Sequence, residues 1–151
     1  MTVIAWDGTT LAADKMTSFG GLHGTTTKLH RIGSLLVGGC GNTAMIQEML
    51  TWIKNGRQVD KFPERQRDPQ ECTSIMVISE DSVILQYENT PYPLVIQNPY
   101  WAIGSGRDFA MASMFLGKTA LEAVEVASTL CNDCGNGIDV MFRSEVPEHG
   151  E

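Results

Sequence analysis

The sequence predicts an α+β fold in which antiparallel sheets are layered against helices. Runs of short strands alternate with runs of helices, without the regular strand–helix–strand order of a parallel sheet. Two tight strand–turn–strand patterns, at residues 2–13 and 73–88, favour antiparallel pairing. Two sheets sandwiched between layers of helices would use every predicted element.

The chain opens with a predicted β-hairpin over residues 2–13. Short strands of β-branched and aromatic side chains flank Asp7-Gly8, a two-residue turn of the kind that accepts positive φ angles. The returning strand leads directly to an acid, Asp14. Residues 15–27 are rich in Gly, Ser and Thr, and we expect an ordered loop or an irregular strand there.

The middle of the chain predicts strands followed by one helix. Polar and apolar residues alternate over 28–32, as in a half-buried strand, and the apolar strand 35–37 runs into a glycine-rich stretch. Asn42 is a favourable N-cap for a helix over residues 43–54, which is expected to stop at Gly56. The polar, proline-containing segment that follows predicts a surface loop.

The second half of the chain predicts a hairpin, a strand, two helices and a last strand. The hairpin spans residues 73–88, and the strand 100–103 leads into a helix over 107–116. Thr119 opens the next helix with a glutamate three residues later, which is a capping box. Residues 138–142 form the final strand.

Length and charge limit the classes of function. A chain of 151 residues is expected to form one domain, here residues 1–143, with a polar tail at 144–151. The net charge of −7 argues against nucleic-acid and anionic-membrane partners, which require basic patches. No apolar run approaches the ~20 residues of a membrane span. We see no signal peptide and expect a cytoplasmic protein.

Cysteine and glycine motifs leave several readings open. The four cysteines are expected to be thiols in the cytoplasm. Cys131 and Cys134 have the CxxC spacing of a zinc site or a redox pair, but they also suit two cysteines flanking a helix end. The segment 104–110 superficially resembles a dinucleotide-binding turn, yet the element after its helix is a second helix. The sequence calls for no metal and no cofactor.

The remaining candidate for chemistry is Thr2, which follows the initiator methionine. Removal of Met1 would give Thr2 both a hydroxyl nucleophile and a free α-amine, which can act as its general base. Lys28 would keep that amine neutral by like-charge repulsion, and Asp14 would hold the lysine. Gly41 would let a substrate approach backbone N–H donors. The alternative remains open that Thr2 is merely the first residue of a strand.

Five segments of the chain resemble, in the right order, the proteasome β-subunit superfamily, including the peptidase HslV. The resemblance is greatest to short proteasome-type subunits encoded by phages and prophages, and it extends from Thr2 to about Phe142. The five segments are residues 9–14, 28–32, 37–44, 102–110 and 134–139.

The resemblance implies a four-layer αββα sandwich with antiparallel sheets and a threonine-type peptidase mechanism. Thr2 would be the nucleophile and its amine the base, tuned by Lys28 and Asp14, with the Gly41 N–H binding the oxyanion. Compared with the family, the opening hairpin is shorter. Matching Thr2 to the catalytic threonine needs an even deletion, which keeps every side chain on its face.

The resemblance also implies supporting residues near the amine. Ser105 falls on the serine that supports the threonine amine. The family's second acid would be Asn132 or Asp133, of which we select Asp133, and Gly135 stands where a serine is usual.

Family members form homo-oligomeric rings, so the resemblance implies a ring that cuts polypeptide substrates without a cofactor. Such a chamber would need an ATP-dependent unfoldase partner. Two alternatives remain. One is a catalytically inactive assembly protein that keeps the fold and the ring, and the other is a small-molecule amidase with the same nucleophile.

Overall fold

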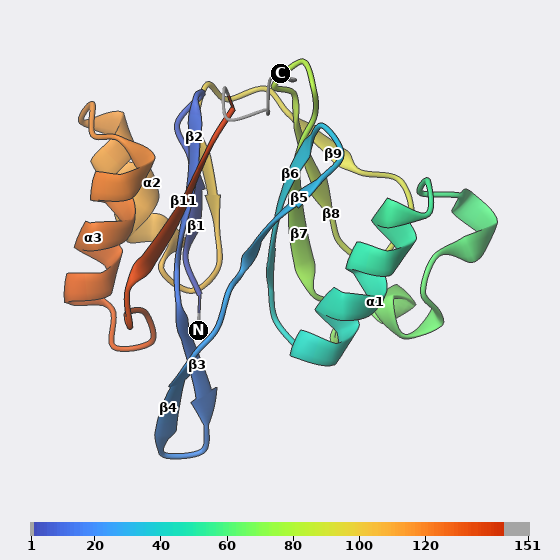
Figure 1. The fold of residues 1–151 in the computed structure, drawn as a ribbon, viewed down its shortest axis with the longest axis horizontal. Helices are drawn as coiled ribbons and strands as arrows, with labels where there is room; N and C mark the ends of the chain where they lie inside the picture. Colours follow the sequence, from blue (N-terminus) through green and yellow to red (C-terminus); the bar gives the residue numbers. More distant parts are fainter. Residues whose placement is uncertain (1, 144–151) are drawn as a thin grey trace, which may run out of the picture.

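The computed structural model describes residues 2–143 and shows four layers (Figure 1). Helices α2 (Arg107–Phe115) and α3 (Ala120–Leu130) cover one sheet, and α1 (Thr43–Lys54) covers the other. The sheets face each other in the middle. The predicted αββα sandwich is confirmed. The predicted tail at 144–151 lies outside the described residues.

The first sheet has the strand order β10-β1-β2-β11, with antiparallel pairing throughout. The central strands therefore come from the N-terminal hairpin, with partners from the second half of the chain on either side. The strands are β1 (Ile4–Trp6), β2 (Thr10–Asp14), β10 (Trp101–Ile103) and β11 (Ile138–Phe142).

The turn of the N-terminal hairpin lies one residue later than predicted. Ile4 pairs with Ala13, so Gly8-Thr9, rather than Asp7-Gly8, occupies the two central positions. Gly8 has a φ of 105°, which suits glycine at the first central position of a tight hairpin turn. Asp7 precedes the turn, and its side chain accepts hydrogen bonds from the N–H groups of Thr9 and Thr10.

The second sheet is also antiparallel, with its strands in sequence order β5-β6-β7-β8-β9. Strand β9 was not predicted, because Pro91 and Pro93 interrupt the pattern before it. As an edge strand, it needs only one set of backbone partners. The bounds are β5 (Leu29–Ile32), β6 (Leu35–Cys40), β7 (Ser74–Ile78), β8 (Ile84–Tyr87) and β9 (Leu94–Ile96).

Residues 15–27 contain a regular hairpin rather than an ordered loop or an irregular strand. Strands β3 (Met16–Phe19) and β4 (Leu22–Thr25) pair in register around Gly20-Gly21 and project from the body of the molecule (Figure 1). Two consecutive glycines allow the backbone conformation of a two-residue turn. This polar hairpin lacked the apolar alternation that identifies a strand from sequence.

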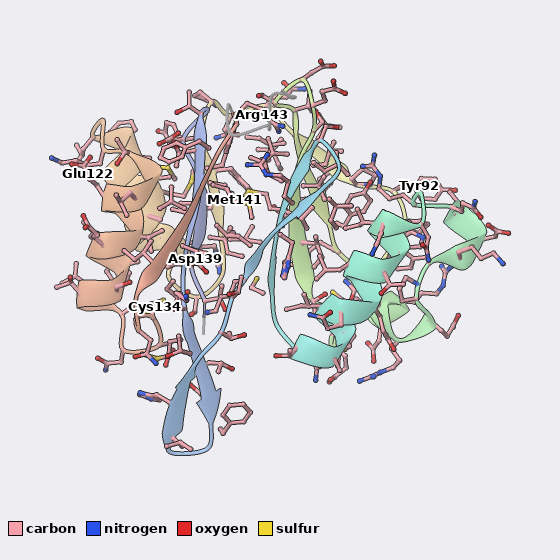
Figure 2. All side chains as sticks on the ribbon, in the orientation of Figure 1. Tyr92, Glu122, Cys134, Asp139, Met141 and Arg143 are labelled. Carbon is pink, nitrogen blue, oxygen red and sulfur yellow. The ribbon has the colours of Figure 1, made fainter. Side chains whose placement is uncertain are left out.

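Three hydrophobic clusters hold the layers together. Between the sheets, large side chains such as Trp6, Leu36 and Met76 are almost fully buried, and Met141 packs against them (Figure 2). Burial of a side chain such as Leu36 or Met76 contributes about 1.5–3 kcal/mol. Alanines predominate where α2 and α3 meet the first sheet, so these helices approach their sheet closely. In the cluster under α1, Trp52 packs edge to face against Phe62 and Tyr87 among aliphatic side chains.

Local signals for helix ends are confirmed. The Asn42 side chain accepts a hydrogen bond from the Met45 N–H at 3.1 Å, and Thr119 forms the predicted capping box with Glu122. The segment after α1 differs from the predicted surface loop. It contains the short 3₁₀ helices η1 (Val59–Lys61) and η2 (Glu64–Arg67), and the buried Gln66 amide hydrogen-bonds to neighbouring backbone. None of the helices in residues 2–143 has the length and apolarity needed to cross a membrane.

Candidate active site

Thr2 is almost completely buried and is held at three points. Its N–H donates to Ser105 Oγ at 3.1 Å, and its carbonyl oxygen accepts from the Gly106 N–H at 3.1 Å. Its Oγ1 accepts a hydrogen bond from Lys28 Nζ at 3.0 Å. The backbone and the hydroxyl of Thr2 therefore have fixed positions relative to one another.

The turn between β10 and α2 fixes the backbone of Thr2. Gly104 has a φ of 101°, and a Cβ on it would overlap the carbonyl oxygen of Thr2. Only glycine allows this close approach. The sequence predicted a tight strand-to-helix turn at 104–106 with Ser105 near the threonine nitrogen, and the structure brings these residues together.

Asp14 organises the polar groups around Thr2. It is fully buried, and its Oδ1 accepts hydrogen bonds from Lys28 Nζ at 2.9 Å and from the Val3 N–H at 3.0 Å. Its Oδ2 accepts from the Gly135 N–H at 3.1 Å and, at 3.3 Å, from a second backbone N–H, that of Met16. A buried carboxylate needs such partners, since an unpaired buried charge is costly.

The two sheets supply opposite halves of this arrangement. Asp14 ends β2 in the first sheet, whereas Lys28 immediately precedes β5 in the second. The ion pair between them is buried, with side-chain exposures of 8% for Lys28 and 0% for Asp14. Lys28 thus places one positive charge between the carboxylate and the Thr2 hydroxyl.

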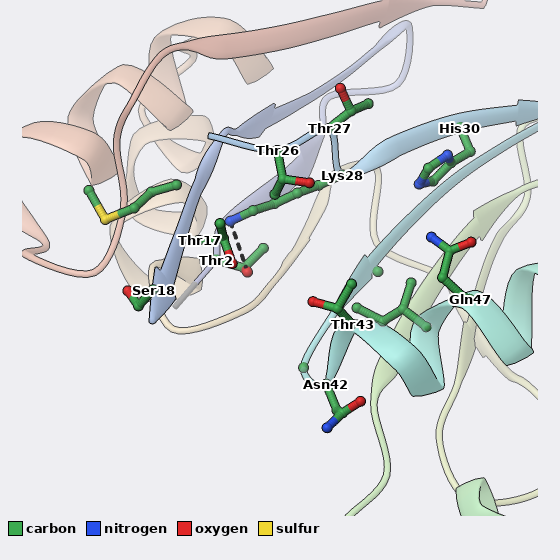
Figure 3. A pocket seen from close by; sticks show the side chains of 14 residues that line it. Thr2, Thr17, Ser18, Thr26, Thr27, Lys28, His30, Asn42, Thr43 and Gln47 are labelled. Carbon is green, nitrogen blue, oxygen red and sulfur yellow. Dashed lines mark hydrogen bonds between the residues drawn. The ribbon is translucent and has the colours of Figure 1, made fainter. Parts of the chain in front are cut away.

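A cavity of about 340 Å³ opens beside Thr2, between β3, β5 and the start of α1 (Figure 3). Figure 3 shows the hydrogen bond from Lys28 to Thr2 at one side and His30 and Gln47 at the other. Burial lowers the pKa of His30, so this side chain is neutral at physiological pH. Most of the lining side chains are uncharged and polar.

Gly41 lines the same cavity as Thr2. It has a φ of 123°, and a Cβ there would press against Thr73 at 3.0–3.2 Å. Gly41 also lies between β6 and the N-cap of α1, where backbone N–H groups are free of helical partners. The predicted placement of Gly41 near Thr2 agrees with this geometry.

Asp133 does not join the group around Thr2. It lies in an exposed turn after α3, and its side chain makes no hydrogen bond among those found within residues 2–143. Asn132 is equally exposed. The neighbouring residues that do reach the site are Gly135, through its N–H to Asp14, and Cys134, which is buried next to it.

The sequence reasoning missed Cys134 and Gly106 as members of the site. The Cys131–Cys134 spacing is visible in the sequence, but nothing there places the second cysteine against Gly106. Gly106 belonged to a recognised turn, yet its N–H partner, Thr2, lies at the other end of the chain. Across the described ranges, no cluster of three or more His, Cys, Asp or Glu side chains is arranged to hold a metal ion.

Solved structures with a similar fold match almost the whole chain. HslV from Trypanosoma brucei has a TM-score of 0.72 and 20% identity, covering 93% of this chain and 98% of its own. BPH from Thiobacillus denitrificans in complex with epoxomicin has a TM-score of 0.70 and 17% identity, covering 95% of this chain and all of its own. The chain has the fold of HslV.

A second structure of BPH from Thiobacillus denitrificans gives a TM-score of 0.68 at 17% identity over 97% of this chain and 100% of its own. No protein-family model matches the sequence, and no curated protein sequence matches it significantly. At this level of identity the HslV likeness shows the fold. Evidence for the chemistry of this chain has to come from the residues around Thr2.

Proposed function

We propose that this chain is a proteasome-type threonine peptidase that acts after removal of Met1. The observation that carries the proposal is the contact of Lys28 Nζ with Thr2 Oγ1 at 3.0 Å, with the same ammonium bound to Asp14 at 2.9 Å. The Thr2 nitrogen lies beside Ser105 Oγ, where a free amine would have a polar partner. The HslV fold supports the same conclusion.

The proposed reaction begins at the trimmed amine of Thr2. The neutral amine takes the proton of Oγ1 as the oxygen attacks the carbonyl carbon of a peptide bond. The positive charge of Lys28 disfavours protonation of the amine beforehand, and Asp14 keeps that charge in place. The Gly41 N–H would donate to the oxyanion. The amine then gives its proton to the departing peptide nitrogen, and water hydrolyses the acyl-enzyme ester.

Met1 decides whether this chemistry can occur. While Met1 is attached, the Thr2 nitrogen is an amide, which has no available lone pair and cannot serve as a base. After removal of Met1, the Thr2 amine would lie beside Ser105 and within reach of the hydroxyl of its own side chain. Asp133, selected from the sequence as a second acid, is not needed for any of these steps.

We also propose that the active form is a homo-oligomeric ring that takes unfolded polypeptides, supplied by an ATP-dependent unfoldase in the cytoplasm. The likeness to HslV supports this assembly. Large apolar side chains at the end of α2, Phe115 and Leu116, are each 76% exposed, and a subunit contact would cover them.

The decisive experiment combines the N-terminal mass with covalent labelling. After expression with a methionine aminopeptidase, mass spectrometry should show a chain beginning at Thr2. A peptide boronate should then inhibit hydrolysis of unfolded protein, and Thr2→Ala should abolish both inhibitor binding and hydrolysis. Epoxomicin is a second probe, because it was solved in complex with BPH.

Matched controls make the result specific to Thr2. Thr129→Ala removes a hydroxyl from the exposed side of α3 and should leave hydrolysis unchanged. Full hydrolysis by Thr2→Ala would contradict the proposal. An intact Met1 with no hydrolysis under any condition would favour the inactive assembly protein, and cleavage of acyl amides without peptides would favour the amidase.

A further inference from the structure

Cys134 lies between two groups that support the Thr2 site: Gly106, whose N–H binds the Thr2 carbonyl, and Gly135, whose N–H binds Asp14. It is 3% exposed and sits at the end of α3 against the first sheet (Figure 2). On one side, a Cβ built on Gly106 would lie 2.9 Å from Cys134 Sγ, so the thiol packs directly on the residue whose N–H binds the Thr2 carbonyl. On the other side, the next residue, Gly135, donates its N–H to Asp14.

The thiol of Cys134 is neutral in this position. Burial raises its pKa most, the nearby charge of Asp14 adds to the rise, and the pKa reaches about 12. A neutral thiol can pack on Gly106 without adding a second negative charge near Asp14. The same side chain as a thiolate would repel the carboxylate that holds Lys28.

Cys131 is placed to react with Cys134. The Cys134 N–H donates to the Cys131 carbonyl oxygen at 3.3 Å, which closes a four-residue turn. The Cys131 thiol is also among the partners that raise the pKa of Cys134. Ends of such turns lie within ~7 Å, the range that a disulfide can bridge. Both side chains are thiols in this structure.

We propose that Cys134 is a positioning residue for the Thr2 site, and that oxidation with Cys131 to a disulfide withdraws it and lowers activity. The activity part of this inference rests on the proposed peptidase function. Disulfide formation does not depend on that function.

The oxidation balances with hydrogen peroxide as the oxidant. Cys131, the more exposed thiol, is first oxidised to a sulfenic acid with release of water. The Cys134 thiol then attacks this sulfur, and a second water leaves as the S–S bond forms. Two electrons pass from the thiols to the peroxide, and a dithiol reductant reverses the reaction.

The disulfide changes the support of Thr2 through short connections. An S–S bond of about 2 Å is shorter than any contact between two thiols, so Cys134 Sγ must move away from Gly106 or draw Cys131 inward. Where Cys134 moves, the next residue, Gly135, moves with it, and its N–H shifts relative to Asp14. A displacement of about 1 Å at an active site can lower the rate about a hundredfold.

The test uses the trimmed protein before and after treatment with hydrogen peroxide. We expect the intact mass to fall by about 2 Da, one hydrogen from each thiol. We expect kcat to fall about ten- to a hundredfold with little change in KM, and a dithiol to restore it. Hydrogen exchange at the Gly135 amide should become faster in the oxidised form.

Four variants decide the interpretation. Cys131→Ser cannot form the disulfide and should keep its activity in peroxide, whereas Cys72→Ser should remain as sensitive as the wild type. Cys134→Ala should lower kcat and Cys134→Ser should recover part of it, because serine restores a neutral polar side chain. Peroxide inactivation of Cys131→Ser would overturn the inference.

The two proposals can fail separately. If every form of the protein lacks hydrolytic activity, the peptidase proposal fails. The intact mass and the hydrogen exchange at Gly135 still test the proposed effect of the Cys131–Cys134 disulfide. If the disulfide does not form, or forms without any change in hydrogen exchange at Gly135, the disulfide proposal is wrong whatever the activity.

Discussion

The N–H of Gly135 donates to Asp14 Oδ2 at 3.1 Å across 121 positions of sequence. This bond joins the segment after α3 to the last residue of β2. Because the other oxygen of Asp14 binds Lys28, and Lys28 binds Thr2, the position of the candidate nucleophile depends on both ends of the chain.

Replacing Lys28 with methionine should abolish most of the hydrolysis. The variant keeps an unbranched side chain, one atom shorter, but removes the charge beside the Thr2 hydroxyl, and we expect kcat to fall about 10²–10⁴-fold. It also leaves Asp14 buried without its cation, which should cost about 3–5 kcal/mol of unfolding free energy. Kinetics and urea unfolding measure the two effects. The double variant with Asp14→Asn should recover stability without activity; recovery of both would rule out the proposed role of the lysine.

Gly104→Ala should displace Thr2. Its φ of 101° disfavours any side chain, and the added methyl group would overlap the Thr2 carbonyl oxygen. Gly56 has the same φ of 101° but nothing within 4 Å of an added Cβ, so Gly56→Ala is a matched control for backbone strain alone. We expect Gly104→Ala to lose activity and boronate binding, and Gly56→Ala to lose only stability. Equal activities in the two variants would show that this close approach is unimportant.

Asp7→Asn should destabilise the protein in a pH-dependent way. Burial alone would raise the pKa of Asp7, but hydrogen bonds from the N–H groups of Ala120, Thr9 and Thr10 outweigh it, so the pKa is lowered. The Ala120 bond, 2.8 Å long, ties the first hairpin to the start of α3. Loss of the charge at this helix start should cost about 1 kcal/mol at pH 7.

The pH dependence of that cost follows from the sign of the shift. Because the folded pKa of Asp7 lies below the unfolded value, its stabilisation is present above the unfolded pKa and is lost as pH falls through the folded one. The difference in urea unfolding between the wild type and Asp7→Asn should therefore begin to shrink as pH falls below about 4, and it should vanish only below the folded pKa of Asp7. A difference that stayed constant down to pH 2 would assign the effect to shape rather than charge.

Asp133→Asn should have little effect on hydrolysis, whereas Asp14→Asn should reduce it strongly. Asp133 is exposed and makes no described hydrogen bond, while Asp14 accepts bonds from Lys28 and three backbone N–H groups. A comparison of kcat/KM for the two variants measures the contrast. A large loss with Asp133→Asn would restore the role that the sequence suggested for it, through a contact made only in an assembled ring.

Local patterns explain why much of the fold could be predicted. The apolar helix face after Asn42, the capping box at Thr119 and the second hairpin each depend on neighbours within a few residues. The elements that were missed or shifted lack such local signals. Strand β9 follows two prolines, and the polar β3–β4 hairpin has no apolar alternation. In the first hairpin, Asp7-Gly8 and Gly8-Thr9 both suit a two-residue turn, and the strand register selects the second.

The sequence by itself determined the layered α+β fold and, through the resemblance it carries, the set Thr2, Asp14, Lys28, Gly41 and Ser105. Only the tertiary structure decided that the Gly135 N–H binds Asp14 and that Cys134 packs on Gly106, whereas the Asp133 side chain is exposed. The physical reason is that adjacent residues in a turn point in different directions. Which of them faces the buried carboxylate depends on how α3 packs against the first sheet. Patterns of neighbouring residues in the sequence do not predict that packing.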